Sequence, residues 1–165
     1  MNIIAAIIII ISVVFDQVTK FWAADVLKDG VSIKIIGNFL RLNYAENNGA
    51  AFSILQNQRM FFLIVTVIML VFLGFIYFKT KNISKLSKLS IAMITGGAIG
   101  NFIDRLRLGY VIDFIDVRFG NFYNFPIFNI ADSFVVCGTI LMIILILFNR
   151  FEKSESNEWI WFEGY

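Results

Sequence analysis

The sequence contains no histidine among its 165 residues. Zinc sites of the usual kind, cysteine–histidine pairs and serine–histidine–aspartate triads all require an imidazole, so these site types are excluded. The single cysteine, Cys137, lies inside an apolar run. We expect it to be a small core side chain rather than a nucleophile or half of a disulfide. Any chemistry must therefore use Asp, Glu, Lys, Ser, Asn or Arg.

Charged residues are also scarce, at 16% of the chain, whereas 59% of the residues are hydrophobic and the mean hydropathy is +0.79. Such a composition is typical of membrane proteins. The net charge is only +2, and no basic face interleaved with aromatic residues is present. We therefore expect membrane lipids, and no nucleic acid, among the partners of this chain.

Long apolar runs dominate what is present. A helix that spans a hydrocarbon core of roughly 30 Å needs about 20 mostly apolar residues. The runs predict an all-α integral membrane protein with four transmembrane helices, at about residues 2–24, 60–78, 88–105 and 130–148. We expect a single membrane-embedded domain over residues 1–165, in which residues 149–165 form a tail. A cleaved signal peptide is the alternative for the first run, but its positively charged start is missing.

Positive charge predicts the orientation of these helices. Four lysines, Lys79, Lys81, Lys85 and Lys88, lie between the second and third runs, whereas residues 20–59 carry only five positive residues in forty positions. The positive-inside rule places the lysine-rich loop and both termini in the cytoplasm, which is an N-in/C-in topology. The connections between helices 1 and 2 and between helices 3 and 4 are then extracytoplasmic, and we expect a strand in them.

The same topology gathers polar residues from three helices at one depth. Asp16 lies near the end of helix 1, Asn101 near the end of helix 3, and Asp132 at the start of helix 4. An ionisable group at membrane depth costs roughly 2.5–3.5 kcal/mol on insertion scales and faces the bundle interior or a wet cavity. The convergence therefore suggests a functional site at the outer boundary of the hydrocarbon.

Structural roles are alternatives for each of these residues. Asn129 and Asp132, three apart, resemble a capping pair at a helix start. Asp16 and Lys20 have the spacing of an ion pair along a helix. Asn43–Ser53 contains a turn signal followed by small residues. Capping and catalysis are compatible, because a cap can orient an acid that reacts.

The stretch after Gly109 lacks a helical apolar stripe, and the alternation from Asp113 to Phe119 favours a short strand. On a strand, Asp113 and Asp116 point to opposite faces, because they are an odd number of residues apart. Only one of the two can face the bundle, and the neighbouring side chains do not decide which one.

Four ordered blocks resemble the lipoprotein signal peptidase (signal peptidase II) family of bacterial membrane aspartic peptidases. They are DQVTK at 16–20, NNGAAFS at 47–53, GNFIDRLRLGYVIDF at 100–114 and FNIADS at 128–133. The resemblance implies that the catalytic acids are Asp113 and Asp132, which selects Asp113 over Asp116. The substrate-binding or supporting residues that it implies are Asp16, Asn47, Gly49, Asn101, Arg105 and Asn129.

The resemblance also implies an activity and a location. The substrate is a prolipoprotein with a diacylglyceryl-modified cysteine, and the bond before that cysteine is cleaved. No cofactor or metal is expected. The enzyme is expected in the bacterial cytoplasmic membrane, with its site near the extracytoplasmic surface and a monomeric chain.

Two other hypotheses remain open at this stage. A second enzymatic one pairs Ser53 with Lys20 as nucleophile and base, although nothing in the sequence ties the two together. The non-enzymatic one is a membrane cation or proton transporter that uses the buried acids as a relay. Transporters often contain internal repeats, and we find none in this sequence.

Overall fold

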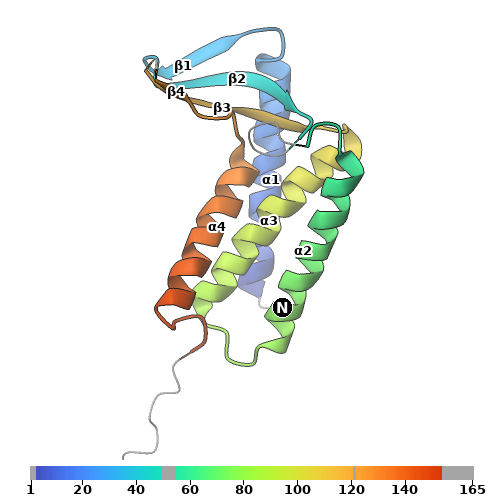
Figure 1. Cartoon of the computed structure of the whole chain (residues 1–165), viewed down its shortest axis with the longest axis vertical. Coiled ribbons are helices and arrows are strands. Elements are labelled where there is room, and N and C mark those ends of the chain that lie inside the picture. The colour runs from blue at the N-terminus through green and yellow to red at the C-terminus, as the bar shows by residue number, and fades with distance from the viewer. Residues whose placement is uncertain (1–2, 50–54, 121, 154–165) are drawn as a thin grey trace, which may run out of the picture.

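Four helices run side by side and carry a small sheet at one end of the bundle (Figure 1). The computed structural model describes residues 3–49, 55–120 and 122–153. The helices are α1 (Ile3–Val26), α2 (Arg59–Lys79), α3 (Lys85–Arg107) and α4 (Ile130–Leu147). Each is long and apolar enough to cross a membrane. We call the two ends of the bundle the sheet end and the opposite end.

Helix α3 is the centre of the bundle and packs against each of the other three helices. Its most apolar 18-residue window is 56% buried, compared with 11% for α2. Close packing depends on glycines: a Cβ on Gly97 would overlap the carbonyl oxygen of Ala131, and a Cβ on Gly100 would lie 2.5 Å from Asp16 Oδ2. The small residues of α3 therefore let the backbones of α1 and α4 approach.

Helix α1 has polar or small side chains on its buried face and large apolar ones on its outer face. Ser12, Asp16, Lys20 and Ala23 are buried, at intervals of three or four residues. Its exposed side chains include many of its isoleucines and valines. This arrangement is the inverse of a helix in a soluble protein, and it fits a helix whose outer face meets lipid.

The sheet has four antiparallel strands in the order β1 (Ser32–Ile36), β2 (Leu40–Asn47), β3 (Val111–Phe119) and β4 (Tyr123–Asn124). The predicted strand is therefore present and begins two residues earlier than expected. The turn expected from Asn43 onward is wrong in its first half, because residues 43–47 belong to β2. These residues form a strand because β3 supplies backbone hydrogen-bond partners for them, and β3 is distant in the sequence.

At the opposite end, the chain that follows α4 folds back across the loop between α2 and α3. The Ser84 amide donates to the Phe151 carbonyl over 3.0 Å, and Lys153 N donates to the Asn82 carbonyl over 2.7 Å. Phe151 packs against a buried apolar cluster of Leu73, Ile83, Ile91 and Ile94. This end of the bundle is closed by apolar packing.

The expectation that Cys137 is a core residue is wrong, because its side chain is exposed. Only three of the 18 residues of α4 are buried: Ala131, Gly138 and Leu145. The cysteine lies outside this narrow buried stripe.

Candidate active site

Strand β3 carries Asp113 at the sheet end of the bundle, where its side chain is almost completely buried. Both carboxylate oxygens accept hydrogen bonds from amide side chains. Asn47 Nδ2 donates to Asp113 Oδ2 over 2.9 Å, and Asn129 Nδ2 donates to Oδ1 over 2.6 Å. The pairing of β2 with β3 places Asn47 beside this acid, because Ala45 lies opposite Asp113 in the register.

Asp132 lies in the first turn of α4, in the predicted capping arrangement. Asn129 Oδ1 accepts from the Asp132 amide over 2.9 Å, and Asp132 Oδ2 accepts from the Asn129 amide over 3.2 Å. The other oxygen, Oδ1, accepts from Asn101 Nδ2 over 2.7 Å. Asn129 therefore caps α4 with one end of its side-chain amide and contacts Asp113 with the other. A single buried residue joins the two acids.

The surroundings of Asp113 favour its protonated form. Burial, which is the largest cause, and the nearby Asp132 carboxylate raise the pKa of Asp113 to about 7. The hydrogen bonds from Asn47 and Asn129 and the charge of Lys20 act in the opposite direction. Desolvation and a like charge both disfavour ionisation of the Asp113 carboxyl group.

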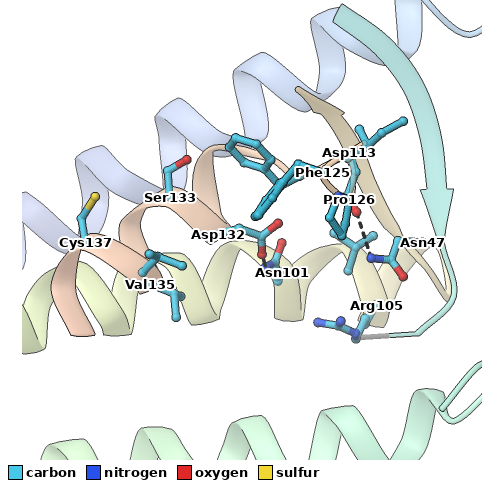
Figure 2. A pocket seen from close by; sticks show the side chains of 14 residues that line it. Asn47, Asn101, Arg105, Asp113, Phe125, Pro126, Asp132, Ser133, Val135 and Cys137 are labelled. Atoms are coloured by element: carbon cyan, nitrogen blue, oxygen red, sulfur yellow. Dashed lines mark hydrogen bonds between the residues drawn. The ribbon is translucent and has the colours of Figure 1, made fainter. Parts of the chain in front are cut away.

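Both acids line a cavity of about 430 Å³. Its wall is formed by Asn47, Asn101, Arg105, Val111, Asp113, Phe125, Pro126, Ile127, Phe128, Asp132, Ser133, Val135, Val136 and Cys137. Figure 2 shows the polar side chains grouped near the two acids, and Val135 and Cys137 further along α4. The cavity therefore joins a polar end, which contains both acids, to an apolar surface on a membrane-length helix.

Arg105 fixes the edge of this cavity. Its Nη2 donates to the Gly49 carbonyl over 3.1 Å, and its guanidinium carbon lies 4.7 Å from the centre of the Phe62 ring. The arginine thus ties the chain after β2 and the start of α2 to α3. Residues 50–54 lie outside the described residues, and so does the serine hypothesis for Ser53.

Asp116 is as buried as Asp113 but does not line the cavity. It accepts from Asn43 Nδ2 over 2.5 Å and from Arg118 Nη2 over 2.7 Å. The two aspartates therefore have separate partners, as expected for residues three apart on a strand. This contrast agrees with the choice of Asp113 from the resemblance.

Asp16 lies behind the cavity wall. Its predicted ion pair with Lys20 is confirmed, with 2.9 Å between Nζ and Oδ2. Asp104 also pairs with Lys20, over 2.9 Å, and accepts from Gln17 Nε2 over 2.9 Å. The sequence did not indicate that Asp104 and Gln17 join this cluster, because Asp104 lies on a different helix from Lys20 and is the hydrogen-bond partner of Gln17.

The described residues contain no group of three or more His, Cys, Asp or Glu side chains that could hold a metal ion. The polar groups that line the cavity include two carboxylates, two asparagine amides, one serine hydroxyl and one guanidinium. Carboxylates can exchange protons, and the amides and the guanidinium can hold peptide carbonyls or the acids themselves.

Comparison with known proteins connects this geometry to a family. The sequence model described as Signal peptidase (SPase) II matches residues 8–148. A lipoprotein signal peptidase of Clostridium tetani is 43% identical over 141 residues, which are 86% of this chain and 90% of that one. A lipoprotein signal peptidase of Staphylococcus aureus (strain JH9) is 44% identical over 146 residues, which are 88% of each.

Solved structures agree with these relatives. A structure described as a bacterial membrane enzyme superposes with a TM-score of 0.83 at 41% identity, over 92% of both chains. A second structure with the same description gives a TM-score of 0.78 at 43% identity, over 87% of this chain and 92% of the other. The two relatives are named as peptidases, and the two solved structures are described as membrane enzymes. The chain belongs to the signal peptidase II family.

Proposed function

We propose that this protein is an aspartic endopeptidase that removes the signal peptide from bacterial prolipoproteins, by cleaving before a diacylglyceryl-modified cysteine. The relatives are named lipoprotein signal peptidases, which supports this class of substrate. The single observation that carries the catalytic assignment is that Asp113 and Asp132 line one cavity and share Asn129 as a hydrogen-bond partner.

The two acids work as a pair that holds one proton. The ionised acid takes a proton from a water molecule, and that water attacks the carbonyl carbon of the scissile peptide bond. The protonated acid donates a hydrogen bond to the carbonyl oxygen and later protonates the leaving amine. The proton belongs to the pair, so neither aspartate is assigned as the permanent acid. A raised pKa for Asp113 supports this division of roles.

The polar groups around the pair have supporting roles. Asn47, Asn101 and Asn129 orient the acids, and Arg105 with the Gly49 carbonyl holds the substrate side of the cavity. Asp16 supports the start of α4, where the Ala131 amide donates to Asp16 Oδ1 over 2.9 Å. The substrate peptide enters from the side of the bundle while its acyl chains stay in lipid along α4.

The membrane position follows the same reasoning. The lysine-rich loop between α2 and α3 faces the cytoplasm by the positive-inside rule, so the sheet end faces the extracytoplasmic side. The enzyme is a monomer in the bacterial cytoplasmic membrane, and it uses no cofactor or metal.

The test is cleavage of one precursor in two forms, with and without the diacylglyceryl group, by the purified protein in detergent. We expect cleavage of the lipidated form before its cysteine, little cleavage of the unlipidated form, and full activity in the presence of a chelator. The Asp113→Asn variant should be inactive on both. Equal cleavage of the two forms would contradict the substrate assignment, and normal turnover by Asp113→Asn would contradict the catalytic assignment.

A further inference from the structure

Lys20 is a charged residue that the reaction above does not use, although it is buried directly behind the site. Its side chain is 2% exposed. Its ammonium group lies 2.9 Å from Asp16 Oδ2, 2.9 Å from Asp104 Oδ2 and 2.8 Å from Asn101 Oδ1. An ammonium group has three donor hydrogens and no acceptor. All three are therefore in use, and Lys20 is not among the residues that line the cavity.

These contacts determine which way the Asn101 amide points. Asn101 Oδ1 accepts from Lys20 Nζ and also from Asn129 Nδ2 over 3.1 Å. Its Nδ2 then points to Asp132 Oδ1, 2.7 Å away. If the amide turned over, its NH₂ group would meet two donors, and its oxygen would meet a carboxylate oxygen. The position of Lys20 therefore ensures that Asn101 presents a donor to Asp132.

The partners of Lys20 also fix the backbone around Asp132. Asp16 accepts from Lys20 with Oδ2 and from the Ala131 amide with Oδ1, over 2.9 Å. Gly100 makes this approach possible, because a Cβ there would lie 2.5 Å from Asp16 Oδ2. The cluster thus holds both the first turn of α4 and the amide that faces Asp132.

We propose that Lys20 is a positioning residue for Asp132: it orients the Asn101 amide toward that carboxylate and, through Asp16, holds the start of α4. This inference rests on the proposed function and adds a residue to it. It assigns Lys20 no contact with substrate. It also disfavours Lys20 as the base of a serine peptidase, because no lone pair or free donor of its ammonium group reaches the cavity.

If Lys20 acts through its charge, its removal should change the pH dependence of kcat/KM. The charged groups that face the two acids are Lys20 from α1, Asp104 and Arg105 from α3, and the acids themselves. The Lys20 charge lowers the pKa of Asp113. Its removal should therefore move both limbs of the pH profile of kcat/KM to higher pH.

The experiment compares Lys20→Met with Gln17→Met on the lipidated precursor. Gln17 belongs to the same cluster and donates to Asp104, to Asp16 and to the Gly100 carbonyl, but it does not contact Asn101. We expect Lys20→Met to lower kcat by about 10- to 100-fold, as for outer-shell ligands that orient a reacting group. KM should stay within a factor of about three, and the pH profile should move upward. Gln17→Met should lower Tm and leave kcat and the pH profile as in the wild type.

A second variant covers the case in which Lys20→Met does not fold. The double variant Lys20→Met/Asp104→Asn removes one charge of each sign and keeps the net charge of the cluster, and Asp104→Asn alone is its control. We expect the double variant to lose kcat. Asp104→Asn alone should keep kcat and move the pH profile to lower pH, because it removes a negative charge near the acids. Wild-type kcat and pH profile in both Lys20 variants would overturn the inference while cleavage by the wild type leaves the proposed function intact. A wild-type protein that does not cleave the precursor overturns both.

Discussion

The two ends of the bundle are both closed by packed side chains, but among the described residues the buried ionisable groups all lie at the sheet end. The opposite end is filled by the apolar cluster around Ile83 and Ile91, with Phe151 packed against it. The sheet end has an apolar cluster as well, formed by Ala23, Leu27 and Phe114. Beside it this end buries charged and polar groups: Asp16, Lys20, Asp104, Asp113 and Asn129 are each at most 3% exposed. The same four helices are thus closed by apolar packing at the opposite end and by packing that includes buried charges at the sheet end.

The difference indicates what each end is for. Burial of apolar side chains stabilises a fold by about 25 cal/mol per Å². Burial of ions gives little or no net stability, since desolvation offsets the attraction between the charges. Stability alone would therefore favour an apolar sheet end as well. The proposed reaction gives a reason for the charged cluster, and changes at the two ends should then have different consequences.

Substitution of a catalytic acid should have the largest effect. We expect Asp132→Asn to lower kcat by about 10³-fold or more, because an amide cannot exchange a proton with water or the leaving amine. Asp116→Asn is the control, since Asp116 is another acid of the sheet end, is more deeply buried than Asp132, and faces Asn43 and Arg118 instead of the cavity. Turnover of the lipidated precursor and Tm in detergent measure the two effects. Loss of activity in both variants would mean that burial of charge, and not the position of Asp132, matters.

The two helix caps compare the ends directly. Asn129 caps α4 at the sheet end, and Ser84 caps α3 at the opposite end, where its hydroxyl accepts from the Ser87 amide over 3.1 Å. Either residue changed to Ala should cost about 1 kcal/mol of stability. Only Asn129→Ala should also lower kcat/KM, by about 10²-fold, because it removes a hydrogen bond to Asp113. An equal loss of activity in Ser84→Ala would remove the distinction between the ends.

Glycines on α3 and α2 test the packing that brings the site together. We expect Gly97→Ala to cost about 1–3 kcal/mol, because the new methyl group would overlap the Ala131 carbonyl and force α4 away. Gly74→Ala is the control: a Cβ there has no neighbour within 4 Å, and alanine favours the helix by about 0.5–1 kcal/mol. Unfolding in detergent gives the free energies. Activity should fall only in Gly97→Ala, because α4 carries Asp132.

The sequence allowed the helices and part of the site to be predicted, for a physical reason. Long apolar runs and helical spacing are local signals, and they indicated the four helices and the capping pair of Asn129 and Asp132. Strand periodicity put Asp113 and Asp116 on opposite faces but did not select one. That choice depends on the register of β2 with β3, which contains an irregularity between Leu42 and Ala45. Only the resemblance to a family favours Asp113.

Local patterns in the sequence could not predict the contacts between segments that are distant along the chain. The pair of Lys20 with Asp104 depends on how α1 and α3 are rotated about their axes, which the sequence pattern does not fix. The same limit explains the error for Cys137, whose apolar neighbours suggested burial in protein. In a membrane protein an apolar run has two destinations, the protein core and the lipid, and hydropathy does not distinguish them.

The last comparison concerns stability and not activity: a dependence of stability on pH is expected at the sheet end alone. The pKa of Asp113 is raised to about 7 in the folded protein, whereas an unfolded aspartate titrates near about 3.9. Between these values the folded state binds more protons than the unfolded state, so stability falls as pH rises, and the fall ends above about pH 7. The slope is at most about 1.4 kcal/mol per pH unit.

Asp113→Asn should lose this slope, so that its Tm relative to the wild type increases from pH 5 to pH 8. Ser84→Ala, at the opposite end, should keep the slope of the wild type. An unchanged slope in Asp113→Asn would show that this acid is ionised throughout the range, which contradicts a proton shared with Asp132.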